Sequence, residues 1–173
     1  MTHSDPRLEP LVPAHAGELL AGLQDPELYE FIADTPPVSV EALRARYERL
    51  AARRSPDGRQ QWLNWAIWSG ADRAYVGYVQ ATVEAGNAQV AYVVFRPCWG
   101  RGHGRDAVAE MMRLLRAEFG VRRFSARVDV RNQRSRALLE ALGFQCVAIH
   151  PEAEVIRGQP SDDAEYRLEV ERT

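Results

Sequence analysis

The chain has 173 residues, of which 46% are hydrophobic and 27% are charged, and its formal net charge is −2. This size and composition predict one globular domain over residues 1–173. No apolar run reaches the roughly 20 residues of a membrane helix, and an acidic chain binds nucleic acid poorly, so we expect neither partner.

The two cysteines, Cys98 and Cys146, have no spacing that is typical of a metal site or a redox pair. Free thiols are common in a reducing compartment, and we therefore expect a cytoplasmic protein. We expect no bound metal.

The N-terminal part of the chain is predicted to be helical. Residues 13–32 read as helix with an interruption at Asp25-Pro26, because proline is favoured in the first turn of a new helix. Ser39 is predicted to cap a further helix that runs to about Arg54.

Three segments with β character follow, at residues 61–69, 74–84 and 88–95. Short polar turns separate them, and such turns typically join antiparallel neighbours. We therefore expect three consecutive antiparallel strands in the middle of the chain.

The C-terminal half alternates between helix and strand. An amphipathic helix is predicted from Arg105 to Phe119, and Gly120 ends it. The remaining predicted elements are a strand at 124–130, a short helix from Asn132 to Gly143, and strands at 144–149 and 164–170. We interpret the polar segment 151–163 as a loop.

A run of alternating glycines, Gly100, Gly102 and Gly104, lies between the third strand and the long helix. Glycine adopts positive φ readily, and the turn sits at the positive end of a helix dipole, so the run predicts a phosphate or pyrophosphate site. The dinucleotide fingerprint is absent because Arg105 stands where its last glycine would be. A Walker loop is excluded because the chain has no lysine.

The charge distribution agrees with an anionic ligand near the glycine run. Residues 96–136 carry eleven arginines, whereas residues 1–40 carry seven acids and one arginine. A basic centre with acidic flanks suits an anionic cofactor and an amine substrate, although solvated helix faces would give the same counts.

Two motifs about thirty residues apart, at 92–104 and 131–144, resemble the GCN5-related N-acetyltransferases (GNAT). Within that superfamily the chain is most similar to the RimJ/RimL-type branch, which acetylates the N-terminal amine of ribosomal proteins. The resemblance covers about residues 7–170. It implies an α/β (α+β) fold, with a mixed and mostly antiparallel sheet, a splayed central strand pair and helices on both faces.

The resemblance also implies acetyl-CoA as the acyl donor and indicates which residues bind it. The backbone of the glycine run would bind the pyrophosphate, with Arg101 and Arg105 as phosphate clamps unless they are merely solvated. The pantetheine would pair with the preceding strand, where the N–H near Val94 would polarise the thioester carbonyl. The expected cofactor residues are Val93, Val94, Phe95, Trp99, Gly100, Arg101, Gly102, His103, Gly104, Arg105, Asn132 and Ser135.

Two of these residues have alternative interpretations. Trp99 stands where the superfamily loop usually has Gln or Arg, a departure that the ribosomal-protein branch commonly shares. Asn132 begins the family's Asn-x-x-Ser pattern, but it is also a good helix cap.

The catalytic residues are less well defined by the resemblance. Many relatives protonate the leaving thiolate with a tyrosine, and Leu139 stands in its place, so Ser135 would take this role. Gln89 replaces a glutamate of the branch and cannot act as a base. The resemblance offers Glu154 as the base, and the alternatives are Glu152, His150, Glu84 or a water relay.

The sequence therefore predicts an N-acetyltransferase that moves an acetyl group from acetyl-CoA to a primary amine by direct attack. The acceptor would be a protein N-terminus or a small amine, and the enzyme a monomer or homodimer. Because Gln89 and Leu139 lack the proton-transfer groups of relatives, a non-catalytic acyl-CoA-binding or sensing module is the alternative hypothesis.

Overall fold

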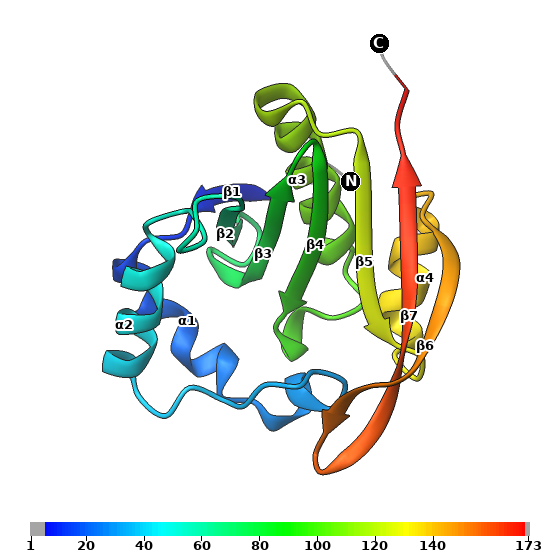
Figure 1. Cartoon of the computed structure of the whole chain (residues 1–173). Helices are drawn as coiled ribbons and strands as arrows, with labels where there is room; N and C mark the ends of the chain where they lie inside the picture. The colour runs from blue at the N-terminus through cyan, green and yellow to red at the C-terminus, as the bar shows by residue number, and fades with distance from the viewer. Residues whose placement is uncertain (1–5, 172–173) are drawn as a thin grey trace.

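The computed structural model describes residues 6–171, and seven strands of this part form one sheet in the order β1-β2-β3-β4-β5-β7-β6 (Figure 1). Neighbouring strands are antiparallel except for β4 and β5, which are parallel. The predicted mixed and mostly antiparallel sheet is confirmed. The strands are β1 (Arg7–Pro10), β2 (Gln61–Ser69), β3 (Ala74–Glu84), β4 (Asn87–Val94), β5 (Arg123–Asp129), β6 (Gln145–Ile156) and β7 (Gln159–Glu169).

Helices cover both faces of the sheet, as expected (Figure 1). They are α1 (Ala16–Leu23), α2 (Val40–Leu50), α3 (His103–Phe119) and α4 (Gln133–Ala141), with 3-10 turns η1 (Pro13–His15), η2 (Pro26–Tyr29) and η3 (Arg96–Cys98). The first two α-helices pack on one face, and α3 and α4 pack on the other. No helix within residues 6–171 has both the length and the apolar character needed to cross a bilayer.

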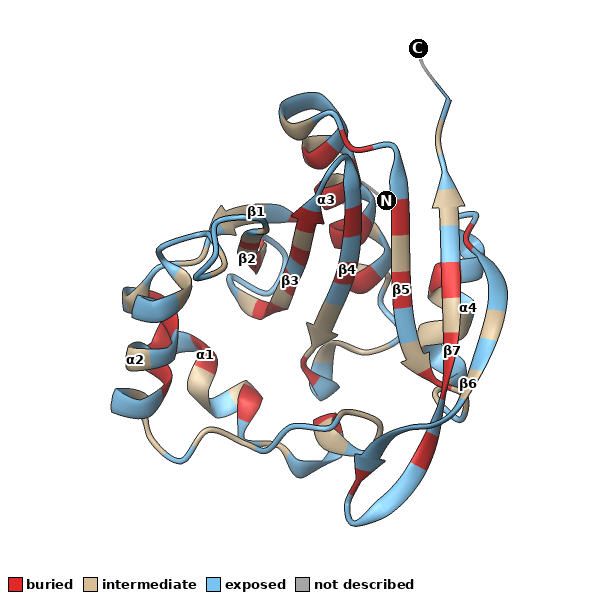
Figure 2. Cartoon of the chain, viewed as in Figure 1, coloured by how far each residue is buried: buried red, intermediate tan, exposed pale blue. Residues whose placement is uncertain are grey.

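Each face of the sheet buries its own apolar core, and the alternation of buried and exposed residues along the strands is visible in Figure 2. On the α3/α4 face, Met111, Leu115 and Leu139 are fully buried against the sheet. On the α1/α2 face, Leu19 and Phe95 belong to the second core. The side chains of a strand point alternately to the two faces, and the strands β2, β3 and β4 contribute to both cores.

The parallel pair β4–β5 splays after a short contact. The two strands pair only from Asn87 with Arg123 to Gln89 with Ser125. Beyond this point β4 stays with β3 up to Val94, whereas β5 stays with β7. Figure 1 shows the two strands diverging towards their lower ends. A gap therefore opens in the middle of the sheet.

The expectation of a loop at 151–163 is wrong. β6 extends to Ile156 and β7 begins at Gln159, so these residues form the outer part of a β-hairpin. The segment has a loop-like sequence because Pro151–Val155 is exposed throughout. Hydrogen bonds between β6 and β7 hold this part of the hairpin. Because Pro151–Val155 has no buried face, its sequence shows little alternation of apolar and polar residues.

Three element boundaries near the N-terminus also differ from the prediction. Residues 7–10 form an edge strand, β1, which is too short to show a periodic pattern. The helix expected to reach Arg54 ends at Leu50, and Arg53 has a positive φ of 56°. After Asp25 the chain makes the 3-10 turn η2 instead of a helix to residue 32.

Helix α1 lies close to the ring of Phe95, and this contact gives a test of the second core. A Cβ atom at Gly22 would lie 2.3 Å from a ring carbon of Phe95, which is 6% exposed. We expect Gly22→Ala to lower the free energy of unfolding by about 1–3 kcal/mol, the usual cost of overpacking. Urea denaturation measures this change.

The matched control is Gly17→Ala in the same helix, where an added Cβ meets nothing within 4 Å. Alanine has the higher helix propensity, so this variant should be more stable by about 0.5–1 kcal/mol. Equal stability of the two variants would contradict the close packing of α1 on Phe95.

Candidate active site

A cavity of about 1210 Å³ opens where β4 and β5 diverge. One end is lined by the turn between β4 and α3 and by the first turn of α4. The other end is lined by residues 31–34, which follow η2, and by the β6–β7 hairpin, whose Arg157 donates a hydrogen bond to the carbonyl of Pro26. The volume exceeds the roughly 300–1,000 Å³ that is usual for a drug-sized ligand, so the cavity has room for two substrates.

The edge of β4 offers backbone groups to this cavity. The Phe95 N–H donates to the Val76 carbonyl at 2.8 Å, and alternate residues of β4 pair with β3 in the same way. The polar backbone groups of Tyr92 and Val94 therefore point into the gap. The Val94 carbonyl accepts a hydrogen bond from Trp99, and the contact of the Val94 N–H with a thioester stays a prediction.

The glycine run provides a cluster of free amide donors. Gly100 and Gly102 have φ values of 71° and 86°, and Gly102 is the N-cap of α3. Within the described residues, the amide N–H groups from Gly100 to Arg105 donate to no backbone acceptor. Such donors at the positive end of a 17-residue helix fit a pyrophosphate group.

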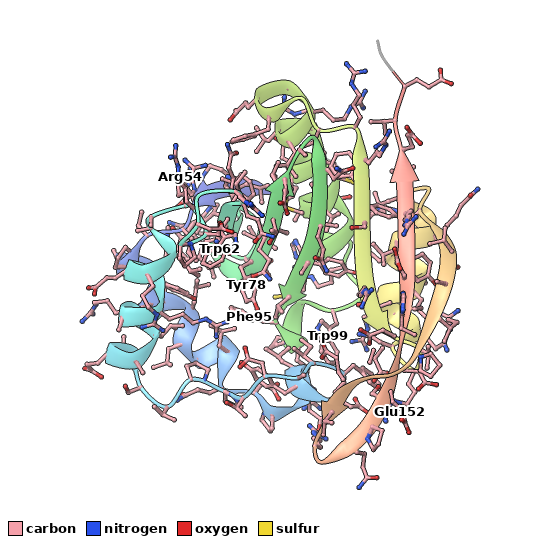
Figure 3. The ribbon with its side chains drawn as sticks, viewed as in Figure 1. Arg54, Trp62, Tyr78, Phe95, Trp99 and Glu152 are labelled. Carbon is pink, nitrogen blue, oxygen red and sulfur yellow. The ribbon has the colours of Figure 1, made fainter. Side chains whose placement is uncertain are left out.

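Trp99 fastens this loop to the sheet. Its Nε1–H donates to the Val94 carbonyl at 2.6 Å, and its ring packs against the second core. The guanidinium carbon of Arg134 lies 3.7 Å from the ring centroid, which is a cation–π contact. Figure 3 shows Tyr78, Phe95 and Trp99 gathered near the lower ends of β3 and β4. A tryptophan in this position therefore has a structural role that Gln or Arg would not reproduce.

Asp72, in the turn between β2 and β3, contacts side chains of the glycine run and was not identified from the sequence. Its carboxylate accepts hydrogen bonds from Ser69 at 2.5 Å and Arg101 at 2.7 Å, and these bonds lower its pKa. His103 Nε2 lies 3.3 Å from the same carboxylate. Nothing in the turn sequence distinguishes this aspartate from a solvated one.

The two predicted phosphate clamps are both close to acidic groups. Arg101 is engaged by Asp72, and Arg105 Nε lies 3.4 Å from Asp106. Both arginines line the cavity and are partly exposed. Their contact with phosphate stays a prediction.

Asn132 and Ser135 lie together at the start of α4 and line the cavity. The Asn132 side chain accepts a hydrogen bond from the Ser135 N–H at 3.1 Å, so the helix-cap interpretation is correct. Tyr92 donates from its hydroxyl to the Ser135 carbonyl at 3.2 Å, and burial raises the pKa of Tyr92 to about 12. The phenol therefore stays protonated and holds this turn beside β4.

Phe95 occupies a different place from the one the resemblance implies. It does not line the cavity: its N–H pairs with β3 and its ring is buried against α1. Val93 and Val94 do line the cavity, and Leu139 is fully buried in the core.

Among the four candidate bases, Glu154 lines the cavity, whereas Glu152, His150 and Glu84 do not. His150 Nε2 is engaged by the Glu165 carboxylate, which lies 2.6 Å away. Partial burial raises the pKa of Glu154, and the negative charge of Asp163 adds to this effect. A carboxyl with a raised pKa is a better base near neutral pH than an ordinary one.

An ion pair between the partly exposed Arg131 and the buried Asp129 fixes the end of β5 beside the cavity. The Asp129 side chain is fully buried and accepts hydrogen bonds from Arg131 Nη2 at 2.6 Å, from the Arg131 N–H at 2.8 Å and from the Ser161 hydroxyl. Burial alone would raise its pKa, but the bonds from Arg131 and Ser161 prevail and lower it to about 2. Asp129 therefore stays ionised and ties β5 to the start of α4 and to β7.

Comparison with known proteins agrees with this geometry. The family model described as "Acetyltransferase (GNAT) domain" matches residues 7–145. No curated protein matches the chain in sequence.

Several solved structures share the fold. Ribosomal-protein-S5-alanine acetyltransferase from Vibrio fischeri has a TM-score of 0.84 at 15% identity, covering 98% of this chain and 95% of that one. RimL, a ribosomal L7/L12 alpha-N-protein acetyltransferase in complex with coenzyme A, has a TM-score of 0.84 at 19% identity, covering 98% and 97%. Spermidine N-acetyltransferase from Vibrio cholerae, in complex with CoA and spermine, has a TM-score of 0.81 at 15% identity, covering 96% of both chains.

The ion pair of Asp129 gives a prediction for stability against pH. Because the fold lowers this pKa from 3.8 to about 2, the carboxylate stabilises the native state above about pH 4 and loses this contribution as the pH falls. We expect Asp129→Asn to lower the free energy of unfolding by about 2 kcal/mol at pH 7 and by about half as much at pH 3. Urea denaturation over this pH range measures the difference.

Glu169→Gln is the control, because Glu169 is an exposed carboxylate on β7. Its effect should be within about 0.5 kcal/mol of zero. A loss in Asp129→Asn that does not change with pH would contradict the ionised state of this carboxyl.

Proposed function

The chain belongs to the GNAT acetyltransferase family and is an N-acetyltransferase that uses acetyl-CoA, and we propose that its acceptor is a primary amine that attacks the bound thioester directly. The observation that carries this proposal is the single cavity in the splayed sheet. It joins the free amide donors of the glycine run, the open edge of β4 and the carboxyl groups of the β6–β7 hairpin. A donor site and an acceptor site thus meet in one space.

The donor end of the cavity suits acetyl-CoA. The amide groups from Gly100 to Arg105 would hold the pyrophosphate, and the edge of β4 would pair with the amide groups of the pantetheine, as an added strand does. Asn132 and Ser135 would contact the arm beyond this point. The Val94 N–H would stabilise the negative charge that develops on the thioester oxygen.

The proposed reaction is a direct acyl transfer. The amine nitrogen attacks the carbonyl carbon, the new C–N bond forms and the C–S bond breaks. The amine loses a proton to Glu154, directly or through water, and the departing thiolate receives one from the Ser135 hydroxyl. Ser135 regains its proton from Glu154 through water.

The acceptor end of the cavity favours a cationic substrate. Glu154 and Asp163 line it without an ion-pair partner within residues 6–171, whereas Asp34 and Glu165 are paired with arginines. The apolar side chains of Leu28 and Phe31 line it as well. The carboxylates would attract an ammonium group, and the apolar wall would contact its substituent. The likeness to acetyltransferases of ribosomal proteins and of spermidine supports either a protein N-terminus or a small amine as the acceptor.

An amine panel tests this function. We expect acetyl-CoA-dependent thiol release with an alanine-initiated peptide, with spermidine or with another primary amine. A protein that binds acetyl-CoA in calorimetry but turns over with no amine would instead be the non-catalytic module that Gln89 and Leu139 suggest.

The proposed catalytic groups give a second prediction. Ser135→Ala and Glu154→Gln should each lower kcat by about 10²-fold, the lower end of the effect of a general acid or base. The dissociation constant of acetyl-CoA, measured by calorimetry, should change less than about twofold, because substrate binding relies mainly on backbone groups.

Glu152→Gln is the matched control, since Glu152 is an exposed glutamate on the same strand that does not line the cavity (Figure 3). It should retain the wild-type kcat. Equal losses in Glu152→Gln and Glu154→Gln would contradict the assignment of Glu154.

A further inference from the structure

A second carboxyl group, on Asp163 of β7, lies in the wall of the cavity without a partner. The residue is 6% exposed, yet within the described residues no hydrogen bond and no ion pair within 4.0 Å ends on its side chain. It lines the cavity together with Glu154. Its carboxylate oxygens are open to the cavity, because they are not among the fully buried side-chain atoms without a hydrogen-bond partner in residues 6–171. An unpartnered carboxylate in a cavity wall is a candidate for ligand binding.

Asp129, its direct neighbour in the sheet, shows the contrast. The register places Asp129 of β5 opposite Asp163 of β7, and both are buried. Asp129 is saturated by Arg131 and Ser161, whereas Asp163 receives no such bonds. The carboxyl group of Asp129 is thus engaged in structural hydrogen bonds, whereas that of Asp163 is open to the cavity.

The basic side chains near Asp163 contact Glu165 instead. His150, its register partner on β6, lies 2.6 Å from Glu165, and Arg127 of β5 lies 3.9 Å from the same glutamate. The negative groups that face it are Asp129, the neighbouring Asp162 and, across the cavity wall, Glu154. No side chain in this surrounding neutralises Asp163 directly.

The electrostatics follow from this arrangement. Burial raises the pKa of Asp163, Arg127 opposes the shift, and the permanent charge of Asp129 adds to it. The charge of Asp163 in turn raises the pKa of Glu154. Two interacting carboxyl groups with raised pKa values hold a proton more readily than isolated ones.

We propose that Asp163 binds the ammonium group of the acceptor and, together with Glu154, takes its proton before the attack. The inference rests on the proposed function and deepens it. The ammonium group supplies the missing partner of Asp163, and it enters through the cavity that both carboxyl groups line. The acceptor class is therefore an alkylammonium ion, in preference to an aromatic amine that is neutral at pH 7.

The protons balance in two steps. The ammonium ion gives one proton to the carboxylate pair, and the neutral amine then attacks the thioester. The second proton leaves the nitrogen as the C–S bond breaks and reaches the thiolate through Ser135. The carboxylate pair returns its proton to water, so the products are an amide, a thiol and one proton.

Asp163→Asn tests the proposal with two readouts. With an alanine-initiated peptide and spermidine as probes, kcat/KM for the amine should fall about 10²-fold or more, while the dissociation constant of acetyl-CoA stays unchanged. The melting temperature of the free protein at pH 7 should rise by about 2–4 °C, because the substitution removes an unpartnered charge beside Asp129.

The pH dependence of the melting-temperature difference follows from the raised pKa of Asp163. The pKa of Asp163 is raised in the native state, so its charge destabilises the fold above that pKa, and this cost disappears as the pH falls below the unfolded value of 3.8. The difference in melting temperature between Asp163→Asn and the wild type should therefore shrink towards pH 4.

Glu169→Gln, on the same strand and exposed, is the control and should change neither readout. An Asp163→Asn variant with wild-type kcat/KM overturns the proposal. So does a variant that loses activity together with stability or fails to fold, because that result shows a structural role. A wild-type protein that acetylates no amine contradicts the proposed function itself. That outcome is seen without the Asp163 variant, so the two failures are distinguishable.

Discussion

β4 and β5 pair in parallel from Asn87 with Arg123 to Gln89 with Ser125 and then diverge, and the candidate site depends on this separation. Had the pairing continued, the backbone groups of Tyr92 and Val94 would bond to β5 and no cavity would remain. Each strand is held on its other side, β4 by β3 and β5 by β7, so the gap does not leave either strand loose. The sheet thereby keeps its hydrogen bonds and still presents a free edge to a ligand.

The two ends of the cavity are held by different kinds of interaction. At the donor end, backbone amides and a helix N-terminus make the binding surface, and side chains such as Trp99 and Asp72 hold it in position. At the acceptor end, side-chain carboxyl groups make the surface, and their different environments shift their pKa values in opposite directions. Asp129 is fixed in its ionised form by Arg131, whereas Asp163 and Glu154 face the cavity with raised pKa values.

Local sequence patterns predicted the glycine turn and the cap of α4 correctly, but they missed the hairpin that lines the cavity. The glycine run and the cap at Asn132 work through the backbone within a few residues, so spacing alone reveals them. The hairpin at 151–163 is exposed and polar, and its sequence therefore looks like a loop. Asp163 lies within that segment, and the error in secondary structure hid the residue that we now place beside Glu154.

The sequence by itself determined the fold class, the family and the donor, because glycine spacing, helix caps and strand alternation are set by neighbours along the chain. Only the tertiary structure decided which acidic residues are available for chemistry. Arg131 is a near neighbour of Asp129 in sequence, but only the strand register brings Ser161 within reach of Asp129 and leaves Asp163 facing the cavity. Contacts across a sheet join residues that are far apart in sequence, and composition and spacing carry no record of them.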